Sequence, residues 1–126
     1  MAAKRILIID DEPDIREVAQ MSLEMVSGWQ VLTAESGEEG IAKARQEKPD
    51  AILLDAMMPS MDGPTTFQKL QADPSTKQIP VIMFTAKVQQ ADKIRFAEMG
   101  VKEMITKPFD PMKLGSQIAA ILGWSV

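Results

Sequence analysis

The 126-residue sequence contains no cysteine and no histidine. Without cysteine the chain can form no disulfide, no thiolate metal site and no cysteine nucleophile. Without histidine it lacks the commonest general base and the commonest transition-metal ligand, which excludes Ser-His hydrolases and zinc hydrolases. Any chemistry of this chain therefore depends on carboxylates, hydroxyls and the cations of lysine and arginine.

Long apolar runs and a basic surface are missing too. No apolar stretch approaches the roughly 18 residues of a membrane-spanning helix, and the run from Ile6 to Ile9 ends at Asp10, so it is not a signal peptide. With 14 Lys and Arg against 18 Asp and Glu, the formal net charge is −4, and no basic stripe could neutralise nucleic-acid phosphates. We therefore expect a cytoplasmic protein without membrane insertion and without direct nucleic-acid binding.

The length and composition indicate one globular domain. At 45% hydrophobic and 25% charged residues, the chain is ordinary for a folded protein and long enough to bury one hydrophobic core. No repeat, linker or low-complexity tract divides it. We predict that residues 1–126 form a single domain.

Five short apolar runs alternate with five segments of helical periodicity. The expected strands are Arg5–Asp10, Trp29–Ala34, Ala51–Asp55, Pro80–Thr85 and Glu103–Thr106. Strand followed by helix, five times over, is typical of an α/β fold with a parallel sheet covered on both faces. Of the common doubly wound arrangements, we expect the five-stranded order 2-1-3-4-5, which is flavodoxin-like.

Capping residues mark the expected starts of the first three helices. Pro13 suits a first helical turn, Ser36 and Glu39 have the spacing of a capping box, and Asp62 can cap the third helix. Pro49 stops the second helix. The apolar positions with helical spacing are Ile15, Val18, Ala19, Ser22, Met25 and Val26 in the first helix, and Phe67 and Leu70 in the third.

The last two helices are predicted in the same way. The fourth covers Ala91–Met99, and we expect Ile94 and Ala97 to face inward. The fifth has Asp110 as its cap and Pro111 in its first turn. Its expected inward positions are Leu114, Ile118, Ile121 and Leu122, and Gly123 ends it.

The polar residues of interest stand where the expected strands end. Asp10 and Asp11 follow the first strand, Asp55 ends the third, Thr85 ends the fourth and Lys107 follows the fifth. In an open α/β sheet, ligands bind outside the carboxyl ends of the strands where the strand order reverses. With the order 2-1-3-4-5, the first and third strands are neighbours there, so their three aspartates should meet.

Such an arrangement indicates phosphoryl chemistry. Three carboxylates in one crevice repel each other unless a cation lies between them, and all-oxygen ligands suit Mg²⁺ or Mn²⁺. The Thr85 hydroxyl and the Lys107 ammonium would then face a tetrahedral phosphoryl group. A carboxylate such as Asp55 can itself be the nucleophile and form an aspartyl phosphate.

Each of these residues also has an ordinary structural explanation. Acidic residues at a helix start complement the helix dipole, and for any one acidic pair that explanation is the simpler one. Asp55 alone could form a turn, Thr85 could merely end a strand, and Lys107 could be a surface charge. Their joint placement at four strand ends on the same edge favours a functional site.

Several segments across nearly the whole chain have the order and separations of a known family. They are Asp10-Asp11, Leu53-Leu54-Asp55, Met58-Pro59, Asp62-Gly63, Thr85-Ala86 and Thr106-Lys107-Pro108-Phe109. In this combination the chain resembles the receiver domain of bacterial two-component response regulators, either of the stand-alone, chemotaxis-regulator-like kind or cut from a longer regulator. The resemblance implies a phosphoacceptor in a phosphorelay, not an enzyme that acts on outside substrates.

The resemblance also implies roles for the acidic residues. Asp55 would accept the phosphoryl group from the phosphohistidine of a histidine kinase or phosphotransfer protein. Mg²⁺ or Mn²⁺ would be bound by Asp11, Asp55 and the backbone carbonyl of Met57, with Asp10 acting through a water. The backbone amides of Met57 and Ala86 would contact the phosphoryl oxygens.

The remaining implied residues concern the response to phosphorylation. Thr85 and Lys107 would contact phosphoryl oxygens, and the Lys107–Pro108 peptide bond would be cis. The signal would leave through the fourth helix, fifth strand and fifth helix toward an unknown target protein. Many members carry an aromatic switch residue where this chain has Met104, whose flexible side chain favours a soft response.

Two further positions bear on the lifetime of the acyl phosphate. In the family the residues two positions beyond the acceptor and beyond the switch threonine flank the attacking water, and here these are Met57 and Lys87. A thioether is at best a weak acceptor, and an ammonium only donates. We therefore predict a comparatively long-lived phosphorylated Asp55.

Alternative functions can be weighed on named residues. An aspartate-nucleophile phosphatase usually needs a second acid two positions after its nucleophile, where this chain has Met57. A flavin carrier needs a neutral, hydroxyl-rich loop after the first strand, where this chain has Asp10-Asp11-Glu12. A receiver with a complete site that serves as a scaffold stays open as an alternative.

Overall fold

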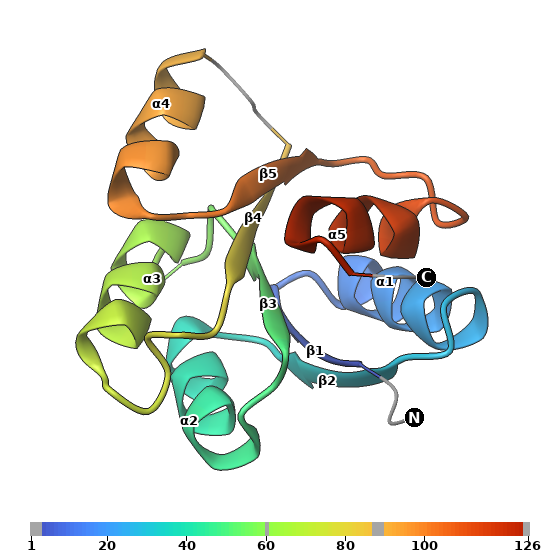
Figure 1. Cartoon of the computed structure of the whole chain (residues 1–126), viewed down its shortest axis with the longest axis horizontal. Coiled ribbons are helices and arrows are strands. Elements are labelled where there is room, and N and C mark those ends of the chain that lie inside the picture. Colours follow the sequence, from blue (N-terminus) through green and yellow to red (C-terminus); the bar gives the residue numbers. More distant parts are fainter. Residues whose placement is uncertain (1–3, 60, 87–89, 125–126) are drawn as a thin grey trace.

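Strand and helix alternate throughout the part of the chain that the computed structural model describes, residues 4–59, 61–86 and 90–124 (Figure 1). The elements are β1 (Arg5–Ile9), α1 (Pro13–Met25), β2 (Gln30–Ala34), α2 (Gly37–Glu47), β3 (Ala51–Asp55), α3 (Gly63–Ala72), β4 (Val81–Thr85), α4 (Gln90–Met99), β5 (Glu103–Thr106) and α5 (Leu114–Leu122). Among these residues, no helix is long and apolar enough to cross a membrane.

The five strands form one parallel sheet in the order β2-β1-β3-β4-β5, which confirms the predicted fold class. The last paired residues place Ile9 beside Leu54, Asp55 beside Phe84, and Thr85 beside Thr106. All the strands therefore end at one edge of the sheet, and β1 and β3 end side by side there.

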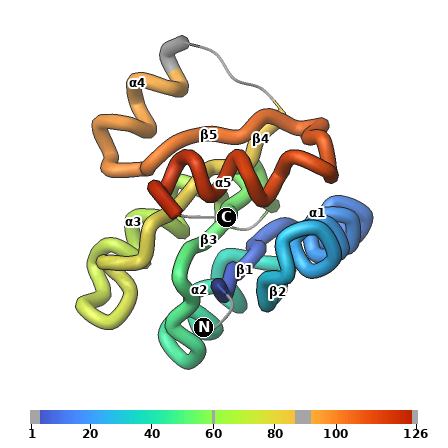
Figure 2. The backbone as a smooth tube through the Cα atoms, turned by 45° about the vertical axis from the view of Figure 1, so that its right-hand side comes forward, coloured from blue at the N-terminus to red at the C-terminus, as the bar shows by residue number. Residues whose placement is uncertain are grey.

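Helices cover both faces of the sheet, and each face has its own apolar core (Figures 1 and 2). On one face α1 and α5 pack over Ile6 and Ile8, and on the other α2, α3 and α4 pack over Leu7 and Ile9. The residues Ile6 to Ile9 are fully buried because successive strand side chains point to opposite faces, and both faces are covered.

The predicted caps of α2 and α3 are confirmed. The Ser36 Oγ accepts a hydrogen bond of 3.1 Å from the Glu39 backbone N–H, and the Asp62 Oδ1 accepts one of 2.8 Å from that of Thr65. Each cap satisfies a backbone donor that the helix itself leaves unpaired. The Asp62 cap starts α3 close to the end of β3, where Gly63 N–H donates to the Ala56 carbonyl at 3.1 Å.

The inward face of α1 differs from the apolar spacing in the sequence. Ala19, Ser22 and Leu23 are buried, whereas Val18 and Met25 are exposed. Helix α5 determines this rotation, because the segment before it docks on α1, where the Ser22 hydroxyl donates to the Pro111 carbonyl. Leu23 faces the core together with α5.

Two predictions for the last helices are wrong. In α4, Ile94 is 51% exposed and Ala97 is exposed, while Phe96 is only 5% exposed and joins the core of the α3 face. Burying the large aromatic ring of Phe96 is more favourable than burying Ile94 and Ala97, the two positions that the helical spacing suggested. Asp110 caps a turn, not the helix: its Oδ1 accepts from Met112 N–H at 2.9 Å, and α5 begins only at Leu114.

Candidate functional site

The carboxyl edge of the sheet brings together the charged residues expected there. Asp10 follows β1, where its N–H donates to the Ala34 carbonyl at 3.0 Å, and Asp55 ends the neighbouring β3. Lys107 follows β5, with its N–H donating to the Thr85 carbonyl at 2.8 Å. Backbone pairing between parallel strands therefore fixes where these side chains start.

Lys107 lies among three carboxylates. Its Nζ is 2.7 Å from Asp10 Oδ2, 3.3 Å from Glu12 Oε1 and 3.5 Å from Asp55 Oδ1. Lys107 is 9% exposed and Asp55 only 3%, so little water screens the pairs of Lys107 with Asp10 and Asp55. The ammonium of Lys107 also lies over the Phe84 ring, with Nζ 5.1 Å from the ring centroid.

Four carboxylates are close enough to share a cation. One oxygen each from Asp10, Asp11, Glu12 and Asp55 lies within 4.8 Å of the others. Asp11 Oδ1 and Asp55 Oδ2 are buried and have no hydrogen-bond partner in the described part of the chain. A buried oxygen without a partner is costly, and an all-oxygen donor set suits a hard ion. These residues fit Mg²⁺ or Mn²⁺.

The electrostatics of the site act on Asp55 itself. Burial raises the pKa of Asp55 to about 7, and the negative charge of Asp10 and the Asp11 carboxyl add to this effect. The Met57 amide and Lys107 stabilise the ionised form and only partly offset the rise. For Lys107, burial alone would lower the pKa, but the contacts with Asp10 and then Asp55 and Glu12 outweigh burial and raise it. Added positive charge beside Asp55 would therefore favour its nucleophilic, ionised form.

The other expected site residues follow β3 or lie on or next to β4 and β5. The Met57 backbone N–H donates to Asp55 Oδ1 at 3.1 Å, while its side chain is 68% exposed. Thr85 is buried at the end of β4, and Ala86 after it is exposed. Met104 is half-buried on β5 and packs against the core of the α3 face. The roles that the family resemblance implies for these residues stay predictions.

The Lys107–Pro108 peptide bond is cis, as the resemblance implied. Lys87 lies outside the described residues, so its predicted place beside the site is not part of this geometry.

Two contacts were not anticipated from the sequence. Glu12 forms an ion pair with Lys107, and Arg16 donates from Nη1 to the Asp10 backbone carbonyl at 2.7 Å. Glu12 could have been suspected as the third acid in the run after the first strand. The Arg16 contact has no sequence signal, because it depends on how α1 leaves the sheet.

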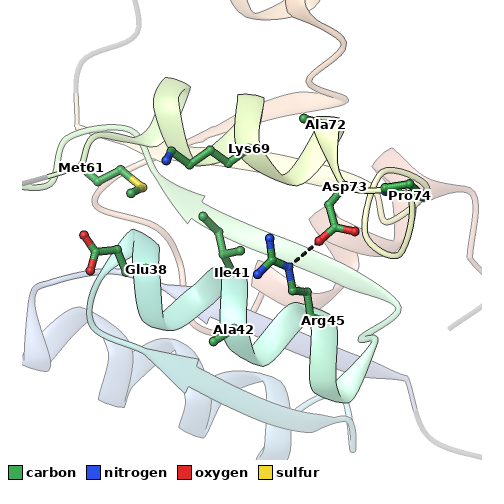
Figure 3. A pocket seen from close by; sticks show the side chains of 9 residues that line it. All are labelled: Glu38, Ile41, Ala42, Arg45, Met61, Lys69, Ala72, Asp73 and Pro74. Carbon is green, nitrogen blue, oxygen red and sulfur yellow. Dashed lines mark hydrogen bonds and ion pairs between the residues drawn. The ribbon is translucent and has the colours of Figure 1, made fainter.

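One cavity opens at this edge of the sheet, and a larger one lies elsewhere. One of about 240 Å³ is lined by Met57, Thr85 and Phe96 and by the charged side chains of Asp62, Asp92 and Arg95, so it opens beside Asp55. A larger cavity of about 600 Å³ lies between α2 and α3, away from the carboxylates, and the ion pair of Arg45 and Asp73 crosses it (Figure 3). The chemistry is therefore not in the larger cavity.

Comparisons with known proteins agree with this geometry. The sequence model of the response regulator receiver domain matches residues 6–119. The alkaline phosphatase synthesis transcriptional regulatory protein PhoP of Bacillus subtilis is 41% identical over 119 residues, covering 94% of this chain and 48% of PhoP. Protein PilH of Pseudomonas aeruginosa is 43% identical over 118 residues, covering 94% of this chain and 97% of PilH. The chain thus spans about half the length of PhoP and nearly all of PilH.

A solved structure is similar in fold and in the kind of site it contains. It is the receiver domain of the sensor histidine kinase PA1611 of Pseudomonas aeruginosa, which has a magnesium ion coordinated in its active site cleft. It superposes with a TM-score of 0.84 at 26% identity, covering 97% of this chain and 99% of that one.

Proposed function

This chain belongs to the family of response regulator receiver domains, and on that premise we propose that it is a phosphorylation-controlled interaction module whose phosphoacceptor is Asp55. Receiver domains are phosphoacceptors and not enzymes that turn over outside substrates. The observation that carries the proposal is a buried Asp55 with one carboxylate oxygen that has no partner in the described part of the chain and with the Lys107 ammonium 3.5 Å from its other oxygen.

The proposed reaction is phosphoryl transfer from a phosphohistidine to Asp55. An oxygen of the Asp55 carboxylate forms a bond to phosphorus as the phosphorus–nitrogen bond breaks, and the electron pair of that bond stays on the imidazole nitrogen. Lys107 offsets the negative charge of the transferring group, and the Met57 and Ala86 amides would bind its oxygens. Apart from the bond that Asp55 forms, the protein contributes by positioning the reacting groups and offsetting their charge.

The metal site proposed for Mg²⁺ uses residues of the same edge. Asp11, Asp55 and the Met57 carbonyl would hold the ion directly, and Asp10 through a water. The buried oxygens of Asp11 and Asp55, which have no hydrogen-bond partner among the residues that the structure describes, support this assignment, as does the magnesium ion in the related PA1611 receiver domain. When bound, Mg²⁺ supplies positive charge that favours the ionised form of Asp55 and offsets the phosphoryl charge.

The output proposed for this domain is a change of its α4, β5 and α5 face. Thr85 ends β4 and is buried next to the site, so a phosphoryl group on Asp55 could draw its hydroxyl inward. Met104 on β5 would follow, with a gradual response because its side chain has several rotatable bonds. The partners proposed are a histidine kinase or phosphotransfer protein upstream and a protein bound by this face downstream.

We also propose that residues 1–126 form one receiver domain and that it acts in the cytoplasm, as receiver domains typically do. The match to PilH along nearly its whole length supports a receiver domain that can act by itself.

Phosphate mapping tests the assignment of Asp55. The protein is incubated with Mg²⁺ and acetyl phosphate, and the acyl phosphate is located by mass spectrometry in the parent, Asp55→Ala and Asp73→Ala. We expect labelling of the parent and of Asp73→Ala at Asp55, and none of Asp55→Ala. Labelling that survives Asp55→Ala, or that proceeds equally in excess chelator, would contradict the proposal.

A further inference from the structure

Hydrogen bonds hold the backbone of Glu12 in place, whereas its carboxylate is open to water. It precedes Pro13 as the N-cap residue of α1, its N–H donates to Asp10 Oδ1 at 2.9 Å, and its carbonyl accepts from Arg16 N–H at 3.1 Å. Its side chain is 59% exposed and, within the described residues, caps no helix donor. The backbone therefore aims Glu12 at the mouth of the site, while its carboxylate can move into water without exposing buried surface.

The ammonium of Lys107 has as many hydrogen-bond donors as it has carboxylate neighbours. A lysine ammonium carries three N–H donors, and Asp10, Glu12 and Asp55 each present an oxygen to it. A phosphoryl group on Asp55 adds strong acceptor oxygens beside the same ammonium. Lys107 can turn toward them only by weakening one of its present contacts.

Of the contacts that Lys107 makes with Asp10 and Glu12, the one with Glu12 can be given up more easily. Asp10 is fully buried and lies at 2.7 Å, so releasing it would leave a buried carboxylate without its cation. Glu12 lies farther away, at 3.3 Å, and water can solvate its carboxylate at once. The cost of exchanging Glu12 for a phosphoryl oxygen is therefore small but not zero.

We propose that Glu12 is a positioning residue that holds Lys107 in the unphosphorylated state and competes with the phosphoryl group for its ammonium. The inference rests on Asp55 being the phosphoacceptor, and it adds a regulatory residue that acts through Lys107. In the phosphorylated state, Lys107 turns from Glu12 to the phosphoryl oxygens. Glu12 therefore lowers both the rate of acyl phosphate formation and the stability of the phosphorylated state.

The matched variants are Glu12→Gln and Asp14→Asn. Both remove one negative charge from the start of α1, but in the described structure the ion pairs of Lys107 are with Asp10, Glu12 and Asp55. We expect Glu12→Gln to form the acyl phosphate about 3-fold faster and to bind fluoroberyllate, a phosphoryl analogue, about 3-fold more tightly, an effect limited by the exposure of Glu12. Asp14→Asn should stay at the parent values, and Glu12→Asp should lie between parent and Glu12→Gln.

A second phosphodonor separates positioning of Lys107 from simple repulsion of the donor. Acetyl phosphate is dianionic near neutral pH, and phosphoramidate is less negatively charged. A residue that competes for Lys107 gives the same gain with both donors, and the gain extends to fluoroberyllate affinity at saturating Mg²⁺. A residue that only repels the donor gives a larger gain with acetyl phosphate.

The outcomes divide as follows. Equal gains of Glu12→Gln with both donors and in fluoroberyllate affinity support the proposal. Parent-like behaviour of Glu12→Gln, an equal gain in Asp14→Asn, or a gain confined to acetyl phosphate overturns it. If the parent itself takes no phosphate at Asp55, the proposed function fails, whereas a labelled parent with unaltered Glu12→Gln removes only this inference.

Discussion

Two aspartates in different regions of the molecule show how the same side chain becomes reactive or structural. Asp55 lies buried at the carboxyl edge of the sheet, one oxygen has no partner among the described residues, and its pKa is raised to about 7, first of all by burial. Asp73 lies beside the α2–α3 cavity, where Ser75 donates from its backbone N–H at 2.9 Å and from its hydroxyl at 2.8 Å, and Arg45 pairs with it (Figure 3). The Ser75 contacts above all lower the pKa of Asp73 to about 2.

The groups around a carboxylate, not the residue type, therefore decide whether it is reactive or structural. Hydrogen-bond donors and water stabilise the negative charge of Asp73, so its ionised form is already stable and requires no ligand. At Asp55 the ionised form is disfavoured until a cation arrives, which keeps an oxygen available for metal and phosphoryl chemistry. Variants in both regions can therefore test this contrast.

The largest effect is expected from the glycines that flank the two regions. A Cβ on Gly63 would lie 2.5 Å from the Asp55 carbonyl oxygen and 2.7 Å from the Ala56 Cα, which are backbone atoms that cannot move aside. A Cβ on Gly37 would meet the Met61 side chain, which can rotate, and the Thr66 Oγ1, which can turn away only by giving up its hydrogen bond to the Asp62 carbonyl. We expect Gly63→Ala to lower the free energy of unfolding by about 3 kcal/mol and Gly37→Ala by about 1 kcal/mol, both measured by urea unfolding. Equal losses would show that the site edge is no stiffer than the α2–α3 side.

The second effect concerns the stability of the metal-free protein. The folded pKa of Asp55 lies above its ordinary value of 3.8, so the contribution of this group is favourable at low pH and is lost as the pH rises from about 4 to about 7. A neutral amide in place of the Asp55 carboxylate does not ionise, so it does not lose this stability as the pH rises. In excess chelator we expect Asp55→Asn to raise the free energy of unfolding by about 2 kcal/mol at pH 8 and by much less at pH 5.

The control for that prediction is Asp73→Asn, which should bring no gain at either pH. Saturating Mg²⁺ should shrink the advantage of Asp55→Asn at pH 8, because the parent then binds the ion at Asp55. An advantage that is equal at pH 5 and pH 8 would contradict the assignment of burial as the cause.

The third effect concerns the lifetime of the acyl phosphate. Met57 stands exposed beside Asp55, and its thioether cannot orient an attacking water as an amide can. We expect Met57→Asn to lose phosphate about 3-fold faster than the parent at saturating Mg²⁺, followed by the decay of labelled protein. Met25→Asn is the matched control, since Met25 is 77% exposed on α1 and should leave the lifetime unchanged. An unaltered lifetime in Met57→Asn would show that this side chain does not restrain the water.

The smallest effect is expected at Asp73. Its folded pKa lies below 3.8, so its contribution to stability is present above that pH and is lost as the pH falls toward 2. Thermal unfolding of the parent should therefore shift to lower temperature between pH 5 and pH 3 by slightly more than that of Asp73→Asn. Parallel shifts in the two proteins would mean that the hydrogen bonds from Ser75 do not favour the ionised form.

Much of the fold could be predicted because local physical chemistry determines it. The unbroken apolar runs mark strands buried on both faces, Ser36 and Asp62 cap the helices that follow them, and the alternation of strand and helix demands a parallel sheet. With the order β2-β1-β3-β4-β5, the strand ends alone bring Asp10, Asp55 and their neighbours to one edge. This part of the site could be predicted because the end of each strand can be located in the sequence itself.

Contacts between elements were decided only by the tertiary structure. The turn of α1 that buries Leu23 and exposes Val18 depends on α5 packing beside it, and the burial of Phe96 in place of Ile94 depends on the core that α4 covers. The pairing of Glu12 with Lys107 joins residues 95 positions apart in the sequence. The sequence by itself determined which residues carry charge at the edge of the sheet. Only the packing of the elements decided which of those charges face one another and which face water, because distance and burial, not residue type, set the strength of an ion pair.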